Sequence, residues 1–353
     1  MSQIDLKARG SGTIPGWLRW LAVATFVVAI ALIAVGASVT STGSGDAVPD
    51  WPLSYGSLTP PMIGGIRYEH SHRLVAGLTA LLIGLTTLFT WLKTTSRKLR
   101  LVSSAALVLV LIQAVLGGLR VLVISTESVQ DAALSVTGAH YVETVRVLIA
   151  TFHAYLAESV VALVLIFLYL TMARADRALF RPVPAAFRPA AMLLFVLLSI
   201  QLVLGALVRH TGAGLVIPDF PLAFGRFIPP FSRFQSPSAV AFWDNPLFRV
   251  AAHFSHRVVG FSIFLVLIGL RVRWRSQPEV SRHLSLLLAL TAVQIGLGGW
   301  IILSGRSLAS TILHVVNGTL IFSGGVLLLY RSFWSGETGV EPAAHGEEAA
   351  VAG

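Results

Sequence analysis

The sequence predicts an all-α integral membrane protein with eight transmembrane helices, arranged as two pseudo-symmetric four-helix bundles. The first observation is composition: the 353 residues are 55% hydrophobic and 12% charged, and the mean hydropathy is +0.79, well above that of soluble domains. The second is that the apolar residues gather in long runs, and the third is that the two halves of the chain repeat the same motifs in the same order. A chain of this kind needs a lipid bilayer around it.

Eight apolar runs reach the roughly 20 residues that are needed to cross a bilayer. They occupy residues 20–39, 72–92, 101–124, 145–172, 190–208, 253–272, 284–303 and 308–330. No small-residue cleavage site follows the first run, so we expect it to be a retained helix and not a cleaved signal peptide.

The formal charge of +10 predicts membrane orientation and excludes a nucleic-acid partner, because the basic residues form short clusters between apolar runs and not one basic face. The clusters lie in alternate loops and comprise Lys93, Arg97, Lys98, Arg100, Arg174, Arg177, Arg181, Arg188, Arg271, Arg273, Arg275 and Arg282. The positive-inside rule then places both termini in the cytoplasm. The absence of cysteine excludes disulfides, thiolate ligands and cysteine nucleophiles.

The internal repeat is clearest in the outer loops and in the third and seventh runs. VTSTGSGDAVPDWPLSYG at residues 39–56 matches VRHTGAGLVIPDFPLAFG at residues 208–225, and QAVLGG at 113–118 matches QIGLGG at 294–299. Four runs precede each restart, so both copies cross the membrane in the same sense, as a parallel repeat. The expected units are a cytoplasmic segment at 1–19, an N-terminal half at 20–172, a linker at 173–189, a C-terminal half at 190–331 and a disordered cytoplasmic tail at 332–353.

Four histidines within apolar runs are the candidate ligands. His72 lies in YEHSHRLVAG and His256 in its repeat HFSHRVVG, while His153 and His314 lie in the fourth and eighth runs. An imidazole facing hydrocarbon needs a partner, a wet cavity or a metal. All four are expected in the outer half of the membrane, where one pair in each bundle can face across the core. A planar iron macrocycle with two axial imidazoles fits this pattern best, although a single such histidine is more often a hydrogen-bonded core residue or a proton relay.

These features, in this order on eight spans, resemble the heme A synthases, the CtaA/Cox15 proteins of cytochrome oxidase assembly. The resemblance covers residues 20–330 through the Thr-Gly-x-Gly loop with its Pro-Asp-Trp-Pro, the Glu-x-x-His-Arg that opens the second span, its His-Arg echo at the sixth, and single histidines in the fourth and eighth. It implies an oxidoreductase of a bacterial-type cytoplasmic membrane that oxidises the C8 methyl of heme O to the formyl group of heme A.

The resemblance also implies a ligand set and partners. His72 and His153 would surround the substrate heme O, and His256 and His314 would ligate the iron of heme b, the cofactor. Heme O synthase and cytochrome oxidase assembly factors are the implied partners, and a homo-oligomer is compatible with the sequence. Some relatives carry a cysteine pair in an outer loop, and this chain does not, so a thiol-dependent electron route is closed to it and the electron donor is unknown.

Glu69 is the candidate catalytic residue. It lies about one helical turn before His72, and the corresponding position in the second half is His253. The resemblance suggests that its carboxylate accepts a proton or stabilises a developing cation beside the macrocycle. The alternative is a surface ion pair with Arg67 or Arg73.

Several other polar residues have two interpretations each. Arg73 and Arg257 follow the ligand candidates and would contact heme propionates or extend to the interface. Arg120 would serve the N-terminal heme or reach the lipid headgroups. Four further histidines lie at or outside the interface, where such a residue can carry protons or bind a stray metal but is more commonly a solvated loop residue: His70, His140, His210 and His253.

Two other functions are consistent with the spans and the histidines. A diheme electron carrier would bind heme without modifying it, but such carriers usually take two histidines from each ligand helix, whereas here each helix offers one. A proton-coupled transporter would bind no heme. The hemes extracted from the purified protein distinguish all three functions.

Overall fold

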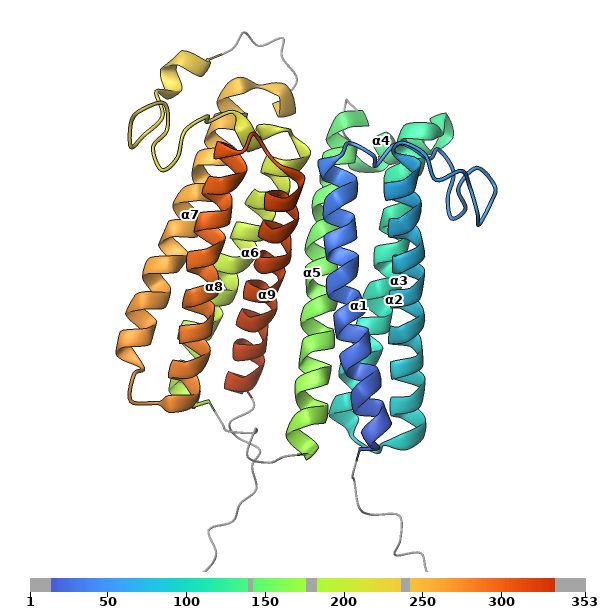
Figure 1. Ribbon diagram of the computed structural model, residues 1–353, viewed down its shortest axis with the longest axis vertical. Helices are drawn as coiled ribbons and strands as arrows, with labels where there is room; N and C mark the ends of the chain where they lie inside the picture. The colour runs from blue at the N-terminus through green and yellow to red at the C-terminus, as the bar shows by residue number, and fades with distance from the viewer. Residues whose placement is uncertain (1–13, 139–141, 176–182, 236–241, 334–353) are drawn as a thin grey trace, which may run out of the picture.

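The computed structural model describes residues 14–138, 142–175, 183–235 and 242–333 (Figure 1). Within these residues the secondary structure is helical apart from two isolated β-bridges in the outer loops. Eight helices are long and apolar enough to cross a membrane: α1 (Gly16–Ser41), α2 (Ile66–Lys93), α3 (Arg97–Ser125), α5 (Val142–Ala175), α6 (Arg188–His210), α7 (Pro246–Arg273), α8 (Pro278–Leu303) and α9 (Leu308–Phe333). They coincide with the eight predicted runs and confirm the fold class.

Two helices begin earlier than the apolar pattern indicates. α2 begins at Ile66 and α7 at Pro246, so His72 and His256 lie at least one turn inside their helices. The prediction that these histidines open their helices is therefore wrong. In α2 the reason is that the first turns carry polar side chains, which hydropathy alone does not count as part of a span. In α7 the start is set by the Asn245 cap and Pro246, which hydropathy also ignores.

Local sequence explains where several helices start. Before α7, the Asn245 side chain accepts hydrogen bonds from the backbone N–H groups of Leu247 (2.9 Å) and Phe248 (3.3 Å), and Pro246 takes the first helical position. Proline also lies in the first turn of α6 and of α8. These caps fix the entry points of the C-terminal helices.

The helices form two groups that follow the repeat. α1, α2, α3 and α5 lie on one side of the molecule and α6 to α9 on the other (Figure 1). α5 packs against α6 and α9, and α1 also packs against α9, so these four helices form the contact between the halves. This arrangement is consistent with the two expected bundles, and their exact boundaries stay a prediction. Residues 1–13, 176–182 and 334–353 lie outside the described part of the chain.

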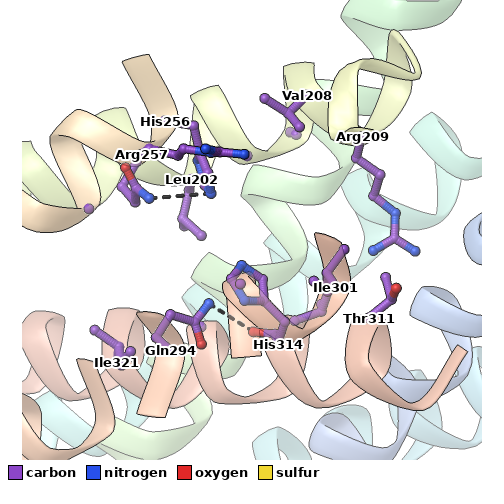
Figure 2. Close-up of a pocket in the computed structure, with 18 of the residues that line it drawn as sticks. Leu202, Val208, Arg209, His256, Arg257, Gln294, Ile301, Thr311, His314 and Ile321 are labelled. Atoms are coloured by element: carbon purple, nitrogen blue, oxygen red, sulfur yellow. Dashed lines mark hydrogen bonds between the residues drawn. The ribbon is translucent and has the colours of Figure 1, made fainter. Parts of the chain in front are cut away.

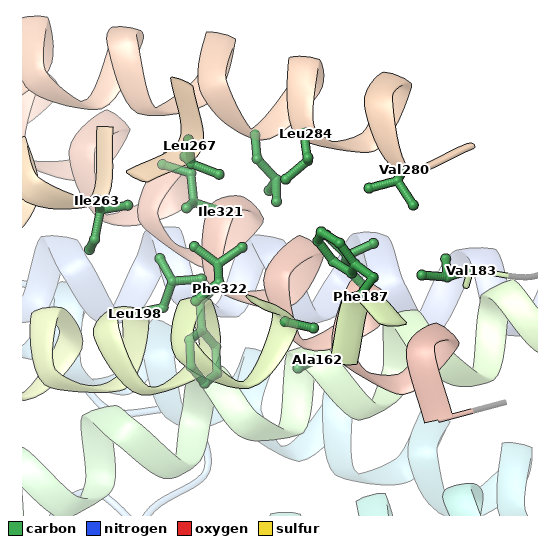
Figure 3. Close-up of a cluster of buried hydrophobic side chains, with 14 residues drawn as sticks. Ala162, Val183, Phe187, Leu198, Ile263, Leu267, Val280, Leu284, Ile321 and Phe322 are labelled. Carbon is green, nitrogen blue, oxygen red and sulfur yellow. The ribbon is translucent and has the colours of Figure 1, made fainter. Parts of the chain in front are cut away.

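The largest buried apolar cluster fills the C-terminal half (Figure 3). Phe187, Leu267, Leu284 and Phe322 come from different segments of that half, and Ala162 of α5 joins them from the other half. Many large apolar side chains instead face outward along the helices, as a lipid-facing surface requires. The core below the histidines is therefore tightly packed and continuous across the contact between the halves.

The two outer loops repeat one hydrogen-bonding pattern. The Asp50 carboxylate accepts from the backbone N–H groups of Tyr55 (2.7 Å) and Gly56 (2.8 Å), and Asp219 accepts from the corresponding two residues at 2.7 Å each. Partial burial raises the pKa of each carboxyl, but the N–H donors outweigh it, so that both pKa values lie below the ordinary range. Each loop is thus held in a defined shape by a charged acceptor.

An aromatic side chain of each loop lies against a helix glycine. A methyl group on Gly118 of α3 would come within 2.7 Å of Trp51, and one on Gly299 of α8 within 2.8 Å of Phe220. The absence of a side chain at Gly118 and Gly299 therefore lets the loop aromatic approach the helix closely. The two loops cap the outer ends of the helices.

One helix was not predicted. The short outer helix α4 (Glu127–Thr137) follows α3 in the N-terminal half, whereas α8 and α9 in the other half are joined by a tight turn. Its 11 residues are too few to cross a bilayer, so a helix of this length gives no transmembrane signal in the sequence.

Candidate functional site

The four candidate histidines lie on alternate helices, one pair in each half. His72 lies on α2 and His153 on α5, both in the N-terminal half. His256 on α7 and His314 on α9 face each other with ring centroids 6.3 Å apart and ring planes inclined by 54° (Figure 2). The structure thus brings together the predicted pair of the C-terminal half, and the pairing of His72 with His153 stays a prediction.

Each histidine ring lies against a glycine of a neighbouring helix. A methyl group would come within 3.1 Å of His72 at Gly36 and within 3.2 Å of His153 at Gly117. In the second half, a methyl group on Gly205 would come within 3.1 Å of His256, and one on Gly298 within 3.5 Å of His314. A methyl group at Gly36, Gly117 or Gly205 would press on the ring, whereas one at Gly298 would make an ordinary van der Waals contact with His314. The first three glycines therefore let the rings lie close to the neighbouring helix.

Glutamine side chains fix the ligand helices. The Gln113 amide donates to the carbonyl oxygen of His153 at 2.8 Å, and Gln294 donates to that of His314 at 2.9 Å. Only the second half has a further glutamine, Gln201, whose amide nitrogen donates to Nε2 of His256 at 3.4 Å (Figure 2). The backbone at His153 and at His314 is thus anchored to the QxxLGG helix of its own half.

A cavity of about 320 Å³ surrounds His256 and His314. Its size lies at the lower end of the range of about 300–1,000 Å³ that is usual for small-molecule sites. The walls are mostly apolar, with small residues such as Gly260 and Gly318. A flat apolar ligand with a polar edge suits such a space.

The residues fit an iron porphyrin held by two imidazoles. Two rings bound to opposite sides of one metal at about 2 Å each have centroids roughly 6 Å apart, which agrees with the His256–His314 separation. In each of the four rings, Cε1 and Nδ1 are the atoms nearest to the glycine behind it. The Nδ1 side of the ring therefore packs against the helix, and Nε2 is the nitrogen on the other side for a metal to bind.

Glu69 is buried, with 4% of its surface exposed, and both of its oxygens have partners. Oε1 pairs with Arg73 at 2.7 Å and Oε2 accepts from the backbone N–H of Val48 at 3.0 Å. The pairing with Arg73 matches one of the two interpretations from sequence. Arg67 instead donates to the hydroxyl of Tyr68. The catalytic role of Glu69 stays a prediction.

Arg73 and Arg257 hold the outer loops in equivalent ways. Arg73 donates to the carbonyl oxygens of Asp50 (2.7 Å) and Leu53. Arg257 donates to the carbonyl oxygens of Leu222 (2.8 Å) and Ile217 (3.1 Å). The propionate contacts expected of these arginines stay a prediction, but most of their hydrogen-bonding capacity is taken by the loops.

Two of the four histidines expected to be solvated are buried. His70 is 5% exposed, and its ring contacts Ser54 Oγ at 2.9 Å and the Leu58 carbonyl oxygen at 3.0 Å. His253 is also 5% exposed and accepts at Nε2 from Arg257 Nε at 3.2 Å. The expectation was wrong for both because the outer loops fold back over the helix ends. His140 lies outside the described residues.

Arg120 and His210 face a second, polar cavity between the halves. This cavity of about 400 Å³ also contains Arg146 and Arg209 in its wall. Arg120 donates to the Gly45 carbonyl oxygen at 3.0 Å and pairs with Asp46 at 3.5 Å. It therefore holds the N-terminal loop, in a position from which it also reaches the cavity.

Sequence reasoning missed two charged residues that line the histidine cavity, Arg209 and Glu158. Each is a charged residue inside or at the end of an apolar run, which is a signal of function in a membrane protein. In the repeat, Arg209 corresponds to Thr40 and Glu158 corresponds to Thr319. Because neither charge is repeated, comparison of the two halves does not identify these residues.

The eight helices define a multi-pass helical membrane protein with two candidate ligand histidines in each half. Residues 66–325 match the family described as COX15-CtaA, cytochrome oxidase assembly protein, and this chain belongs to that family.

Named relatives agree with the family. The chain is 27% identical over 322 residues to a heme A synthase of Halalkalibacterium halodurans, covering 87% of this chain and 94% of the relative. It is 26% identical to heme A synthases of Alkalihalophilus pseudofirmus, with 87% and 94% covered, and of Methylobacterium radiotolerans, with 74% and 73% covered.

Proposed function

We propose that this protein is a heme A synthase, a membrane oxidoreductase that converts the C8 methyl group of heme O to the formyl group of heme A. The observation that carries the proposal is the pair of facing rings of His256 and His314, 6.3 Å apart, together with the glycine that lies behind each of the four candidate rings. Family membership and the heme A synthase names of the relatives support the reaction.

The two halves take different ligands. His72 and His153 hold the substrate heme O in the N-terminal half, and His256 and His314 hold heme b in the C-terminal half. The divergence of the repeat supports this division, because Glu69 is replaced by His253 in the second half. When bound, heme b supplies one-electron transfer to the reaction in the neighbouring half.

The residues of the N-terminal half position the substrate and handle a proton. His72 and His153 orient the macrocycle, and Gly36 and Gly117 fix both rings. Glu69, held by Arg73 and the Val48 N–H, is the proton acceptor near the macrocycle edge. The loop that Arg73 and Asp50 fold over the helix end excludes water.

The orientation has both termini in the cytoplasm. The basic residues Lys93, Lys98, Arg271 and Arg273 lie at the ends of helices opposite to the capping loops. The positive-inside rule supports a cytoplasmic position for that end, and thus an outer position for both histidine pairs.

The decisive experiment identifies the bound hemes. The full chain is expressed with a source of heme O and purified, and the hemes are extracted and identified by pyridine hemochrome spectra and mass. Heme A together with heme B supports the synthase. Heme B alone would identify an electron carrier, and a protein without heme would exclude both.

Variants test the division between the halves. His256→Ala and His314→Ala should lower the heme B content and leave heme O in the N-terminal half. His283→Gln is the matched control, because this buried histidine of the same half bonds to the Gly324 carbonyl oxygen at 2.9 Å and lies outside the cavity wall. Full heme B occupancy in both alanine variants would contradict the assignment.

A further inference from the structure

The histidine cavity of the C-terminal half has a polar end and an apolar end. Arg209 and Thr311 lie to one side of the two histidines, and Ile321 lies to the other (Figure 2). The polar end is the outer one, since Arg209 is in the last turn of α6 and Thr311 in the first turn of α9. Arg306 and the hydroxyl residues Thr40 and Ser41 complete it. A ligand with a polar edge would therefore bind with that edge outward.

Arg209 and Arg306 differ from the other cavity-lining arginine in what they contact. Arg257 is engaged by two loop carbonyls and His253. A single nitrogen of Arg209, Nη2, donates hydrogen bonds to the carbonyl oxygen of Ala37 (2.5 Å) and to Oγ of Ser41 (3.3 Å). Within the described ranges neither Arg209 nor Arg306 forms an ion pair, whereas Arg73, Arg120, Arg146 and Arg249 each pair with a carboxylate.

Both guanidinium groups line the same cavity, with Arg209 partly buried and Arg306 exposed at the rim. Two cations at the mouth of an apolar cavity give a positive potential there, which favours a bound anion. A carboxylate in this position would gain charge-assisted hydrogen bonds.

The backbone of Arg306 supports a functional position. Arg306 has φ of 68°, in the left-handed region that non-glycine residues rarely occupy. Its N–H donates to the Ile301 carbonyl oxygen at 2.7 Å, which closes the turn between α8 and α9. The turn places the side chain at the cavity rim, and the cost of the conformation is consistent with a binding role.

The arrangement belongs to the C-terminal half alone. In the repeat, Arg209 corresponds to Thr40 and the tight turn with Arg306 is replaced by α4. Arg209 also lines the second, polar cavity, so a carboxylate beside it keeps access to hydrogen-bonding groups at the outer face. Partial hydration lowers the cost of holding a charge at this depth.

We propose that Arg209 and Arg306 form a carboxylate-binding site that holds the propionate groups of the C-terminal heme and so sets its orientation. The inference rests on the proposed function, in which His256 and His314 bind heme b. It moves the expected propionate contact of this half from Arg257 to the two arginines without carboxylate partners.

The test compares heme b with its dimethyl ester, in which both propionates are uncharged. The full chain is purified without heme, and each compound is titrated while the Soret band is followed. Wild type should bind the free acid more tightly. Arg209→Gln and Arg306→Gln should each weaken binding of the free acid by about 10- to 100-fold and leave the affinity for the ester nearly unchanged.

Two further variants make the result specific. Arg209→Lys keeps the charge and should keep most of the preference, which separates a binding role from a packing role. Arg226→Gln replaces an exposed arginine of the outer loop and should behave as wild type. Full preference for the free acid in the double variant R209Q/R306Q would overturn the inference. Equal binding of acid and ester by wild type would overturn it while leaving the proposed function intact, and no heme binding by wild type would remove both.

Discussion

The hydroxyl of Thr319 on α9 donates to Oε1 of Glu158 on α5 at 3.0 Å. The two residues occupy corresponding positions of the repeat, since each follows a ligand histidine of its own half by five residues. The contact therefore lies where the two halves meet, near the pseudo-symmetry axis. Glu158 also lines the cavity around His256 and His314, and its Oε2 has no hydrogen-bond partner among the described residues.

Thr319→Val should destabilise the protein by about 1–3 kcal/mol, because it leaves both oxygens of a buried carboxyl group without a donor. Glu158→Gln should be at least as stable as wild type, since an uncharged amide costs less to bury in a membrane. Thermal unfolding in detergent measures both. Thr79→Val is the control, because Thr79 is equally buried but its hydroxyl bonds only within its own helix, to Val75 at 2.8 Å. Equal losses in T319V and T79V would contradict the prediction.

Gly205→Ala should weaken heme b binding about tenfold, because the new methyl group pushes the His256 ring from its position. The heme-to-protein ratio and the Soret titration report the change. Gly269→Ala on α7 is the matched control: nothing lies within 4 Å of a methyl group there, so heme binding should be unaffected. Unchanged heme affinity in G205A would show that this glycine does not set the ring position.

Gly36→Ala should act in the other half only. It displaces His72, so heme O should be retained poorly while the heme B content stays normal. Gly77→Ala on α2, with open space around the added methyl group, serves as the control. Loss of heme B in G36A would argue against separate sites in the two halves.

Glu69→Gln should lower the conversion of heme O by a factor of about 100 or more, the usual contribution of a positioned proton acceptor. The amide oxygen can still accept from the Val48 N–H, so the loop and the bound hemes should remain. The ratio of heme A to heme O in extracts gives the conversion, and the total heme content gives the control. Normal conversion would leave Glu69 with its structural contact to Arg73 alone.

Acid should open the outer loops. Because Asp50 and Asp219 have pKa values below the ordinary one in the folded state, they stabilise the loops above the unfolded pKa of about 3.9, and that contribution is lost as the pH falls through the folded pKa. Limited proteolysis should therefore cut the loops of wild type only in acid. Asp50→Asn should expose the first loop at neutral pH and Asp219→Asn the second, so each variant serves as the control for the other. Loops that stay resistant at low pH would refute this role.

Sequence reasoning predicted the eight spans correctly because they follow from a local pattern, and it proposed the two histidine pairs from the internal repeat. Hydropathy over about 20 residues decides whether a helix crosses the bilayer, and the repeat relates His72 to His256 without knowledge of packing. It failed at the helix ends. His70 and His253 look like loop residues in the sequence, yet the folded loops bury both.

The sequence by itself thus determined the fold class and the set of four histidines, since each depends on residues near one another in the chain. Only the tertiary structure decided what each charged side chain contacts: Arg257 donates to loop carbonyl oxygens and Arg209 to a carbonyl oxygen of α1, although both line the same cavity. The same holds for Gly205 behind His256 and for Thr319 beside Glu158. Such contacts join residues tens to more than a hundred positions apart, and their geometry comes from how the helices pack.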